Sequence, residues 1–216
     1  MRPTLATWKT KVVLSLLKRS NTERRWTHRI GPVDPTLFDE ADAVIDCLYP
    51  AEFTGQAITD VLFGKQSPAG RLPFSWPTRA DDVLPEADYT MRGRTYRYAQ
   101  KNVKWAFGFG RSYSTFEYGP SKLSASSVST SSCSSVNISV TVKNSGAVSA
   151  DEVVQGYLRW SSVAPAVETP SLSLIDFERV EIAAGGSATV TLSVRAQPTP
   201  PIRWTARLVW QRFFWP

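Results

Sequence analysis

Hydrophobic and polar side chains alternate with a period of two along the second half of the chain. The apolar positions are Ile138, Val140 and Val142, then Val154, Gly156, Leu158 and Trp160, and last Ala188, Val190, Leu192 and Val194. This period indicates strands that bury one face. Turn residues at Asn144-Ser145-Gly146 and at Gly185-Gly186 separate the runs. Together the runs predict an all-β antiparallel sandwich.

The pattern before this region is different. Ala41 to Leu48 is a short apolar run with β-branched residues, which predicts a buried strand. A helix is predicted from Thr54 to Phe63, because apolar residues fall on one face at helical spacing and Gly64 can end the helix. The order of strand, turn and helix is typical of the last unit of an α/β layer. The predicted fold is therefore an α/β fragment followed by the sandwich.

Residues 79–118 form a connector that is polar at first and then rich in aromatic residues. These are Tyr89, Tyr96, Tyr98, Trp105, Phe107, Phe109, Tyr113, Phe116 and Tyr118. So many aromatic side chains are expected to pack across another surface. Tyr96, Tyr98, Trp105 and Phe107 could instead stack on a sugar ring. Arg94 and Arg97 are expected to pair with acids at the same junction or to contact substrate.

The two ends of the chain are basic and show no clear period. Residues 1–30 carry eight Lys and Arg against one acid, and residues 195–216 carry four Arg and no acid. The run Val12 to Leu17 is too short for a signal peptide or a membrane span, so we expect a short amphipathic helix or a disordered lead-in. The positive charge is confined to the ends, which argues against nucleic-acid binding by the folded body.

Few residues could carry chemistry. His28 is the single histidine, and two cysteines are too few for a zinc site or a disulfide framework. The acids Glu52, Asp81, Asp82, Glu86, Asp88, Glu117 and Glu152 show no spacing that forces two carboxylates together. We therefore expect no catalytic residue, no cofactor and no metal. Asn137-Ile138-Ser139 is a formal N-glycosylation acceptor, meaningful only in a secreted protein.

Five groups of motifs follow one another over residues 34–194. They are Tyr49-Pro50 with Ala57-Ile58-Thr59-Asp60-Val61-Leu62-Phe63-Gly64; Ser67-Pro68-Ala69-Gly70-Arg71-Leu72-Pro73; Gly93-Arg94-Thr95-Tyr96-Arg97-Tyr98; Phe107-Gly108-Phe109-Gly110-Arg111-Ser112-Tyr113-Ser114-Thr115-Phe116; and Glu152-Val153-Val154-Gln155-Gly156-Tyr157 with Leu174-Ile175-Asp176-Phe177-Glu178-Arg179-Val180. In this order they resemble the C-terminal part of glycoside hydrolase family 3 proteins of the β-xylosidase type. The chain departs from that pattern at Pro50-Ala51-Glu52-Phe53, where the family has glycines, and at Arg111, where it has leucine.

The resemblance implies a division of the chain. Residues 1–33 would be an unassigned basic segment, 34–78 the end of an α/β sandwich domain, 79–118 the connector, 119–194 a fibronectin type III-like domain, and 195–216 an unassigned tail. It also implies secretion, although no convincing signal peptide is found. The strands expected to close the fibronectin-like domain are not recognisable after Val194.

The resemblance further implies a glycosidase whose two catalytic carboxyl groups lie upstream, in a (β/α)₈ barrel and in an earlier part of the α/β domain. A barrel alone takes about 250 residues. We therefore expect this chain to be inactive alone and to support a barrel encoded elsewhere. The alternative is a stand-alone fibronectin-like module that binds a carbohydrate or a protein. An exposed apolar patch and an unpaired strand edge are also expected.

Overall fold

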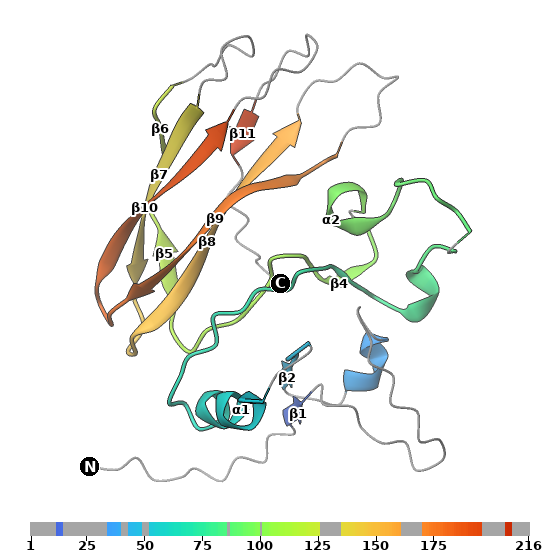
Figure 1. Ribbon diagram of the computed structural model, residues 1–216, viewed down its shortest axis with the longest axis horizontal. Coiled ribbons are helices and arrows are strands. Elements are labelled where there is room, and N and C mark those ends of the chain that lie inside the picture. Colours follow the sequence, from blue (N-terminus) through green and yellow to red (C-terminus); the bar gives the residue numbers. More distant parts are fainter. Residues whose placement is uncertain are drawn as a thin grey trace.

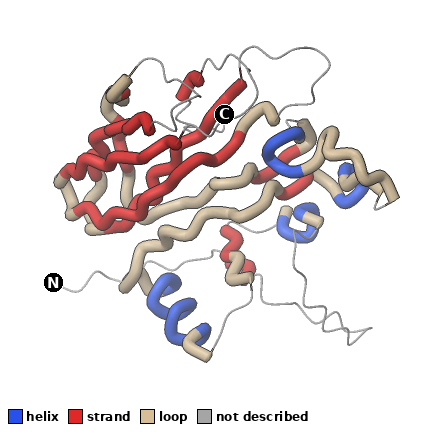
Figure 2. Tube along the Cα trace, turned by 45° about the horizontal axis from the view of Figure 1, so that its top comes forward, coloured by secondary structure: helices blue, strands red, loops and turns tan. Residues whose placement is uncertain are grey.

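The computed structural model describes residues 12–14, 34–39, 43–48, 52–85, 87–99, 101–125, 135–160, 170–195 and 206–208. A two-sheet sandwich lies at one end of the molecule, and a small α/β part lies at the other (Figure 1). Two long extended segments run between these parts, one that follows the α/β part directly and one within the connector (Figure 2). The predicted fold class, an α/β fragment followed by an antiparallel sandwich, is confirmed.

The α/β part contains strands β1 (Val12–Leu14) and β2 (Ala43–Ile45), which pair in parallel. A 3₁₀ helix, η1 (Pro35–Phe38), precedes β2. The expectation of a helix or a disordered lead-in at Val12–Leu14 is wrong. Two adjacent valines suit the pleated surface of a sheet. Strand β2 supplies the backbone hydrogen-bond partners that β1 needs.

Helix α1 (Thr54–Leu62) matches the predicted helix to within one residue. Gly64 follows it with a φ of 72°, a left-handed conformation that glycine adopts without steric cost. The hydroxyl of Tyr113 donates to the carbonyl of Val61 at 2.7 Å. Because the last carbonyls of a helix have no partner inside the helix, this bond ties the end of α1 to the connector.

The connector pairs with the extended segment just before it, and together they form an antiparallel ribbon with short helical turns. From here on the name connector includes that preceding segment, from Gly70 onward. Strand β3 (Trp76–Pro77) pairs with β4 (Val103–Trp105), and the turns are η2 (Ala80–Asp82) and α2 (Thr95–Tyr98). Further along the ribbon, the amide of Leu72 donates to the carbonyl of Phe109, and the amide of Gly108 donates to the carbonyl of Leu72, each at 2.8 Å. The proline-fixed segment after Gly70 thus lies along the Phe107-Gly108-Phe109-Gly110 segment.

The sandwich has two antiparallel sheets. Its strands are β5 (Phe116–Tyr118), β6 (Lys122–Leu123), β7 (Ser135–Asn144), β8 (Ala150–Trp160), β9 (Ser173–Ile182), β10 (Ser187–Arg195) and β11 (Ala206–Leu208). One sheet has the order β10-β7-β5, with β6 also pairing with β7, and the other has the order β11-β8-β9. The last three residues of the predicted connector therefore add a strand to the sandwich.

The predicted period-two positions supply the core of the sandwich. Its buried residues are Val140, Val142, Val154, Ile182, Val190 and Leu192. Leu158 differs from the pattern, because it is only half-buried while its neighbour Tyr157 is 2% exposed. The pairing register of β8 with β9 shifts between Gly156 and Tyr157. Tyr157 is buried because the connector covers that part of β8.

The end of the chain also differs from expectation. We found no strand signal after Val194, but β11 pairs with β8 in register Ala206↔Trp160 to Leu208↔Leu158. A strand of three residues carries too few positions to show a period, and its pairing with the long strand β8 defines it. The rest of the predicted tail, and most of residues 1–33, lie outside the described residues.

Candidate functional site

A buried ion pair joins the connector to the sandwich. The guanidinium Nη2 of Arg71 lies 2.5 Å from Oε2 of Glu152 on β8, and the two side chains are only 14% and 9% exposed. The hydroxyl of Tyr118 on β5 donates to Oε1 of the same carboxylate at 2.5 Å. A buried carboxylate is costly unless it is paired and hydrogen-bonded, and here both oxygens are engaged. Arg71, Glu152 and Tyr118 are called the junction triad below.

Electrostatics at the junction triad favour a protonated tyrosine. Burial raises the pKa of the Tyr118 hydroxyl above its usual range, and the negative charge of Glu152 adds to the rise. The hydroxyl therefore remains a hydrogen-bond donor to Glu152 at neutral pH. Arg71 and Tyr118 thus occupy both oxygens of the Glu152 carboxylate.

Three aromatic rings form the second contact of the junction. The ring of Tyr96 on α2 stacks on that of Phe107, with centroids 3.9 Å apart and an angle of 10° between the planes. Both rings meet Tyr157 on β8 edge-on, at centroid distances of 6.5 Å. The amide of Leu174 on β9 donates to the hydroxyl of Tyr96 at 3.1 Å. The connector is thus fixed to two strands of one sheet through rings and a hydrogen bond.

Two glycines of the Phe-Gly-x-Gly motif allow these segments to approach closely. Gly108 has a φ of 80°, and a Cβ atom there would collide with the side chains of Gln155 and Tyr157. A Cβ atom at Gly110 would collide with the carbonyl of Gly70 and the guanidinium of Arg71. Gly108 is therefore required by the packing of this segment against β8, and Gly110 by its close approach to Gly70 and Arg71.

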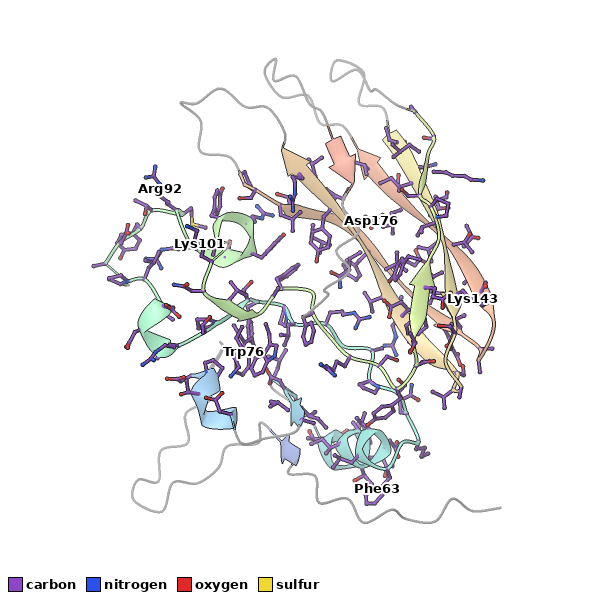
Figure 3. All side chains as sticks on the ribbon, turned by 180° about the vertical axis from the view of Figure 1, so that it is seen from behind. Phe63, Trp76, Arg92, Lys101, Lys143 and Asp176 are labelled. Carbon is purple, nitrogen blue, oxygen red and sulfur yellow. The ribbon has the colours of Figure 1, made fainter. Side chains whose placement is uncertain are left out.

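The residues singled out from the sequence fall into separate groups of contacts. Tyr96 belongs to the aromatic junction, and the Arg97 guanidinium lies 5.9 Å from the centre of the Tyr96 ring. Tyr98 ends α2 and is half-buried. The ring of Trp105 meets the buried ring of Trp76 edge-on at 5.2 Å, near the centre of the connector (Figure 3).

Arg94 braces the connector loop. Its guanidinium donates to the backbone carbonyls of Thr90, Pro85 and Asp88, at 3.0, 2.7 and 2.5 Å. Tyr89 lies between Asp88 and Thr90 in the sequence, and its side chain is 92% exposed. Glu86 of the same loop lies outside the described residues, so the expected pairing of Arg94 with an acid stays a prediction. The planar fork of an arginine can bind several carbonyls at once, and local sequence does not reveal which acceptors lie near it.

The acids of the connector are engaged with their own loop. Asp82 accepts hydrogen bonds from the backbone of Arg79 at 3.0 Å and from the amide of Asn102 at 2.9 Å. Asp88 accepts one from the backbone of Thr90 at 2.9 Å. Glu86 lies outside the described residues, and Glu52 and Glu117 are exposed. Asp82 and Asp88 thus stabilise the turns of the connector loop.

Sequence analysis did not pair Arg71 with Glu152. The two residues are 81 positions apart; Arg71 was noticed only as part of a motif, and Glu152 as part of a motif and as an acid with no evident carboxylate partner. Asn144 was read as a turn residue, yet it is fully buried, donates to the carbonyls of Val148 and Ile182, and accepts a hydrogen bond from Ser114. A polar residue within an alternating apolar run was the available signal.

The described residues give no cluster of histidine, cysteine and acidic side chains that could hold a metal ion. No helix in the described part of the chain is long and apolar enough to cross a membrane.

Comparison with known proteins identifies both parts of the fold. Residues 4–113 match the glycosyl hydrolase family 3 C-terminal domain, and residues 152–199 match a fibronectin type III-like domain. The first match begins within the basic segment that sequence analysis left unassigned. It includes β1, the strand that pairs with β2.

Individual relatives are named as glycosidases. A xylan 1,4-beta-xylosidase of Xylanibacter ruminicola is 37% identical over 72% of this chain and 17% of its own length. A putative beta-xylosidase of Formosa agariphila is 34% identical over 77% of this chain and 22% of its own length. The chain thus spans about one-fifth of the length of these relatives.

Solved structures agree. The beta-glucosidase of Kluyveromyces marxianus superposes with a TM-score of 0.64 at 31% identity, over 76% of this chain and 20% of that one. Beta-glucosidase 3B of Thermotoga neapolitana shares the fold with a TM-score of 0.68 at 23% identity, over 87% of this chain and 26% of that one. The chain therefore belongs to glycosyl hydrolase family 3, and it consists of that family's C-terminal domain and a fibronectin type III-like domain.

Proposed function

We propose that this chain supports a glycoside hydrolase of the β-xylosidase type, whose catalytic carboxyl groups lie in a (β/α)₈ barrel outside this sequence. The observation that carries the proposal is the junction triad. Arg71 in the family's Gly-Arg-Leu-Pro motif is bound by Glu152 in its Glu-Val-Val-Gln motif. The charged side chains of these two motifs thus join two parts of the protein, as expected of a supporting module.

The aromatic residues of the connector fit the same role. Tyr96 cannot offer a stacking face to a sugar on the side that Phe107 covers, and Trp105 packs on the buried Trp76. We propose that Tyr96, Tyr98, Arg97 and Trp105 act as contacts between domains and that Arg94 holds the loop between them. Carbohydrate then binds mainly to groups that the barrel provides.

Domain exchange tests the proposal. The C-terminal segment of the Xylanibacter ruminicola relative would be replaced by this chain, and hydrolysis of an aryl β-xyloside would be measured. We expect the chimera to be active and the truncated relative, without either segment, to be inactive. This chain alone is expected to give no turnover. A chimera no more active than the truncated relative, or turnover by the isolated chain that a Glu52→Gln or Asp88→Asn variant abolishes, would contradict the proposal.

A variant of Glu152 distinguishes a structural role of this residue from a role in substrate binding. Glu152→Gln in the chimera is expected to lower its thermal stability and leave the KM of the folded enzyme unchanged, because Glu152 contacts Arg71 and Tyr118 and not substrate. A large change in KM with unchanged stability would instead assign Glu152 to the binding site. The alternative function, a free-standing binding module, predicts that the isolated chain retains a xylo-oligosaccharide on an affinity gel.

A further inference from the structure

The acceptor motif Asn137-Ile138-Ser139 takes no part in the proposed function. It lies in β7, near the start of the strand. Ile138 is fully buried in the sandwich, whereas Asn137 is exposed. Because side chains alternate along a strand, Asn137 and Ser139 both face away from the core. The amide of Asn137 is therefore presented on the outer surface of the β10-β7-β5 sheet.

The described residues nearest to Asn137 on the flanking strands are small. Ser193 lies opposite Asn137 on β10, and Thr191 lies opposite Ser139. On the other side, the backbone amide of Asn137 donates to the hydroxyl of Ser124 at 3.0 Å. Lys122, which lies opposite Ser139 on β6, is long but exposed and flexible, and Asn137 itself is exposed beside it. The same outer face continues toward Lys143 at the far end of β7 (Figure 3).

The face that carries Asn137 is separate from the junction. The aromatic contacts of the connector are made to Tyr157 and Leu174, on the other sheet. A bulky group on the outer face of β7 would therefore leave those contacts in place. A large hydrophilic addition also suits this surface, where Ser139 pairs with Thr191 and Thr141 with Thr189 through their hydroxyls.

We propose that Asn137 is an N-glycosylation site of this protein. In the transfer, Nδ2 of Asn137 attacks C1 of the first sugar of an oligosaccharide linked to a polyprenyl diphosphate. The new C1–N bond forms as the C1–O bond to the diphosphate breaks, the polyprenyl diphosphate leaves, and the amide loses one proton. The lipid-linked oligosaccharide is supplied by a secretory compartment. This proposal is independent of the hydrolase function.

The fold also sets when the transfer takes place. In the finished strand the side chains of Asn137 and Ser139 are two residues apart, about 7 Å, and the Ser139 hydroxyl is bonded to Thr191 at 2.8 Å. The two acceptor side chains then cannot meet. Strand β10 begins 50 residues after Asn137, so β7 stays unpaired on that edge for about 3–10 s of synthesis. Modification must therefore precede closure of the sheet.

Expression of the full chain behind a secretion leader in yeast tests the proposal. Chains from medium and whole-cell lysate would be compared before and after an amidase that removes N-glycans and converts the modified asparagine to aspartate. We expect the wild type to carry a glycan at Asn137, Asn137→Gln and Ser139→Ala to carry none, and Ser139→Thr to retain it. Asn102→Gln is the matched control, because Asn102-Val103-Lys104 lacks the hydroxyl residue.

The lysate keeps the test valid for variants that fold poorly, since transfer precedes folding. An unmodified wild-type chain, or a glycan that persists in Asn137→Gln, would overturn the proposal. Chain that has been folded in bacteria and then mixed with microsomes is expected to stay unmodified. Efficient modification of that folded chain would refute the timing.

Discussion

The two ends of this molecule bury their apolar side chains to very different extents. In the sandwich, Val142, Val154 and Leu192 are completely buried, whereas α1 has no fully buried residue and its flanking Phe63 is 81% exposed. Phe63 lies at the end of the molecule away from the sandwich (Figure 3). Two facing sheets cover one another, but a parallel strand pair and one helix need another layer. The difference shows that the sandwich covers its own apolar residues, whereas the described part of the α/β end leaves those of α1 exposed.

The largest effect is expected at the junction triad. Glu152→Gln should lower the free energy of unfolding by about 3–5 kcal/mol, because it leaves the Arg71 charge buried without its counter-charge. Denaturant unfolding of the two proteins measures the loss. Arg179→Gln is the control, since it breaks the pair with Asp151, in which the arginine side chain is 62% exposed, and should cost at most about 1 kcal/mol. Equal losses for the two variants would show that the junction triad adds no special stability.

Core truncation in the sandwich comes next. Leu192→Ala should cost about 2–5 kcal/mol, because the removed atoms leave a cavity among fully buried neighbours. The same truncation at Leu62 of α1, which is 40% exposed, should cost much less. Thermal and denaturant melts of both variants provide the measurement. If Leu62→Ala were as costly as Leu192→Ala, the contrast between the two ends would fail.

Alkaline pH should weaken the junction. Burial raises the pKa of Tyr118 in the folded chain above its unfolded value of about 10. The folded protein therefore keeps this proton where the unfolded chain loses it, so stability is intact below pH 10 and falls above it. One such group lowers stability by about 1.4 kcal/mol per pH unit there. Tyr118→Phe should flatten this decline between pH 10 and 11, whereas Tyr89→Phe, at the exposed loop, should leave it unchanged.

The smallest effect on stability is expected at the exposed end of α1. Phe63→Ser should leave the melting of the sandwich almost unchanged but reduce self-association of the isolated chain, because it removes apolar surface from water. Light scattering against concentration measures this. Phe177→Ser on β9 is a matched control, since Phe177 is 61% exposed but lies on the sandwich. Equal reductions in scattering would show that the exposed end of α1 is no more prone to self-association than the sandwich.

What the sequence could predict depended on how far each signal extends along the chain. Long alternating runs predicted β7, β8 and β10, and helical spacing with Gly64 predicted α1. Each of these elements is long enough for its own residues to show the period of a strand or a helix. Strands β1 and β11 have three residues each and exist through their pairing with β2 and β8. Such short strands depend on partners that are distant in sequence, and no local period reveals them.

The junction was beyond prediction for a related reason. The sequence showed that the aromatic connector should pack on another surface, but not that Tyr96 and Phe107 would meet Tyr157. The partner of Arg71 was equally hidden, since any of the acids could have paired with it. Motif resemblance marked the residues that matter, and only the fold shows which of them meet.

The contribution of β5 to the sandwich limits how this protein can be recombined. A gene fusion that carried only residues after 118 would lose the strand paired with Phe116↔Asn144 to Tyr118↔Val142, and it would leave the Glu152 carboxylate without either of its donors. The portable unit must therefore begin before Arg71. A single acidic side chain, Glu152, thus makes the sandwich and the segment before it one unit for recombination.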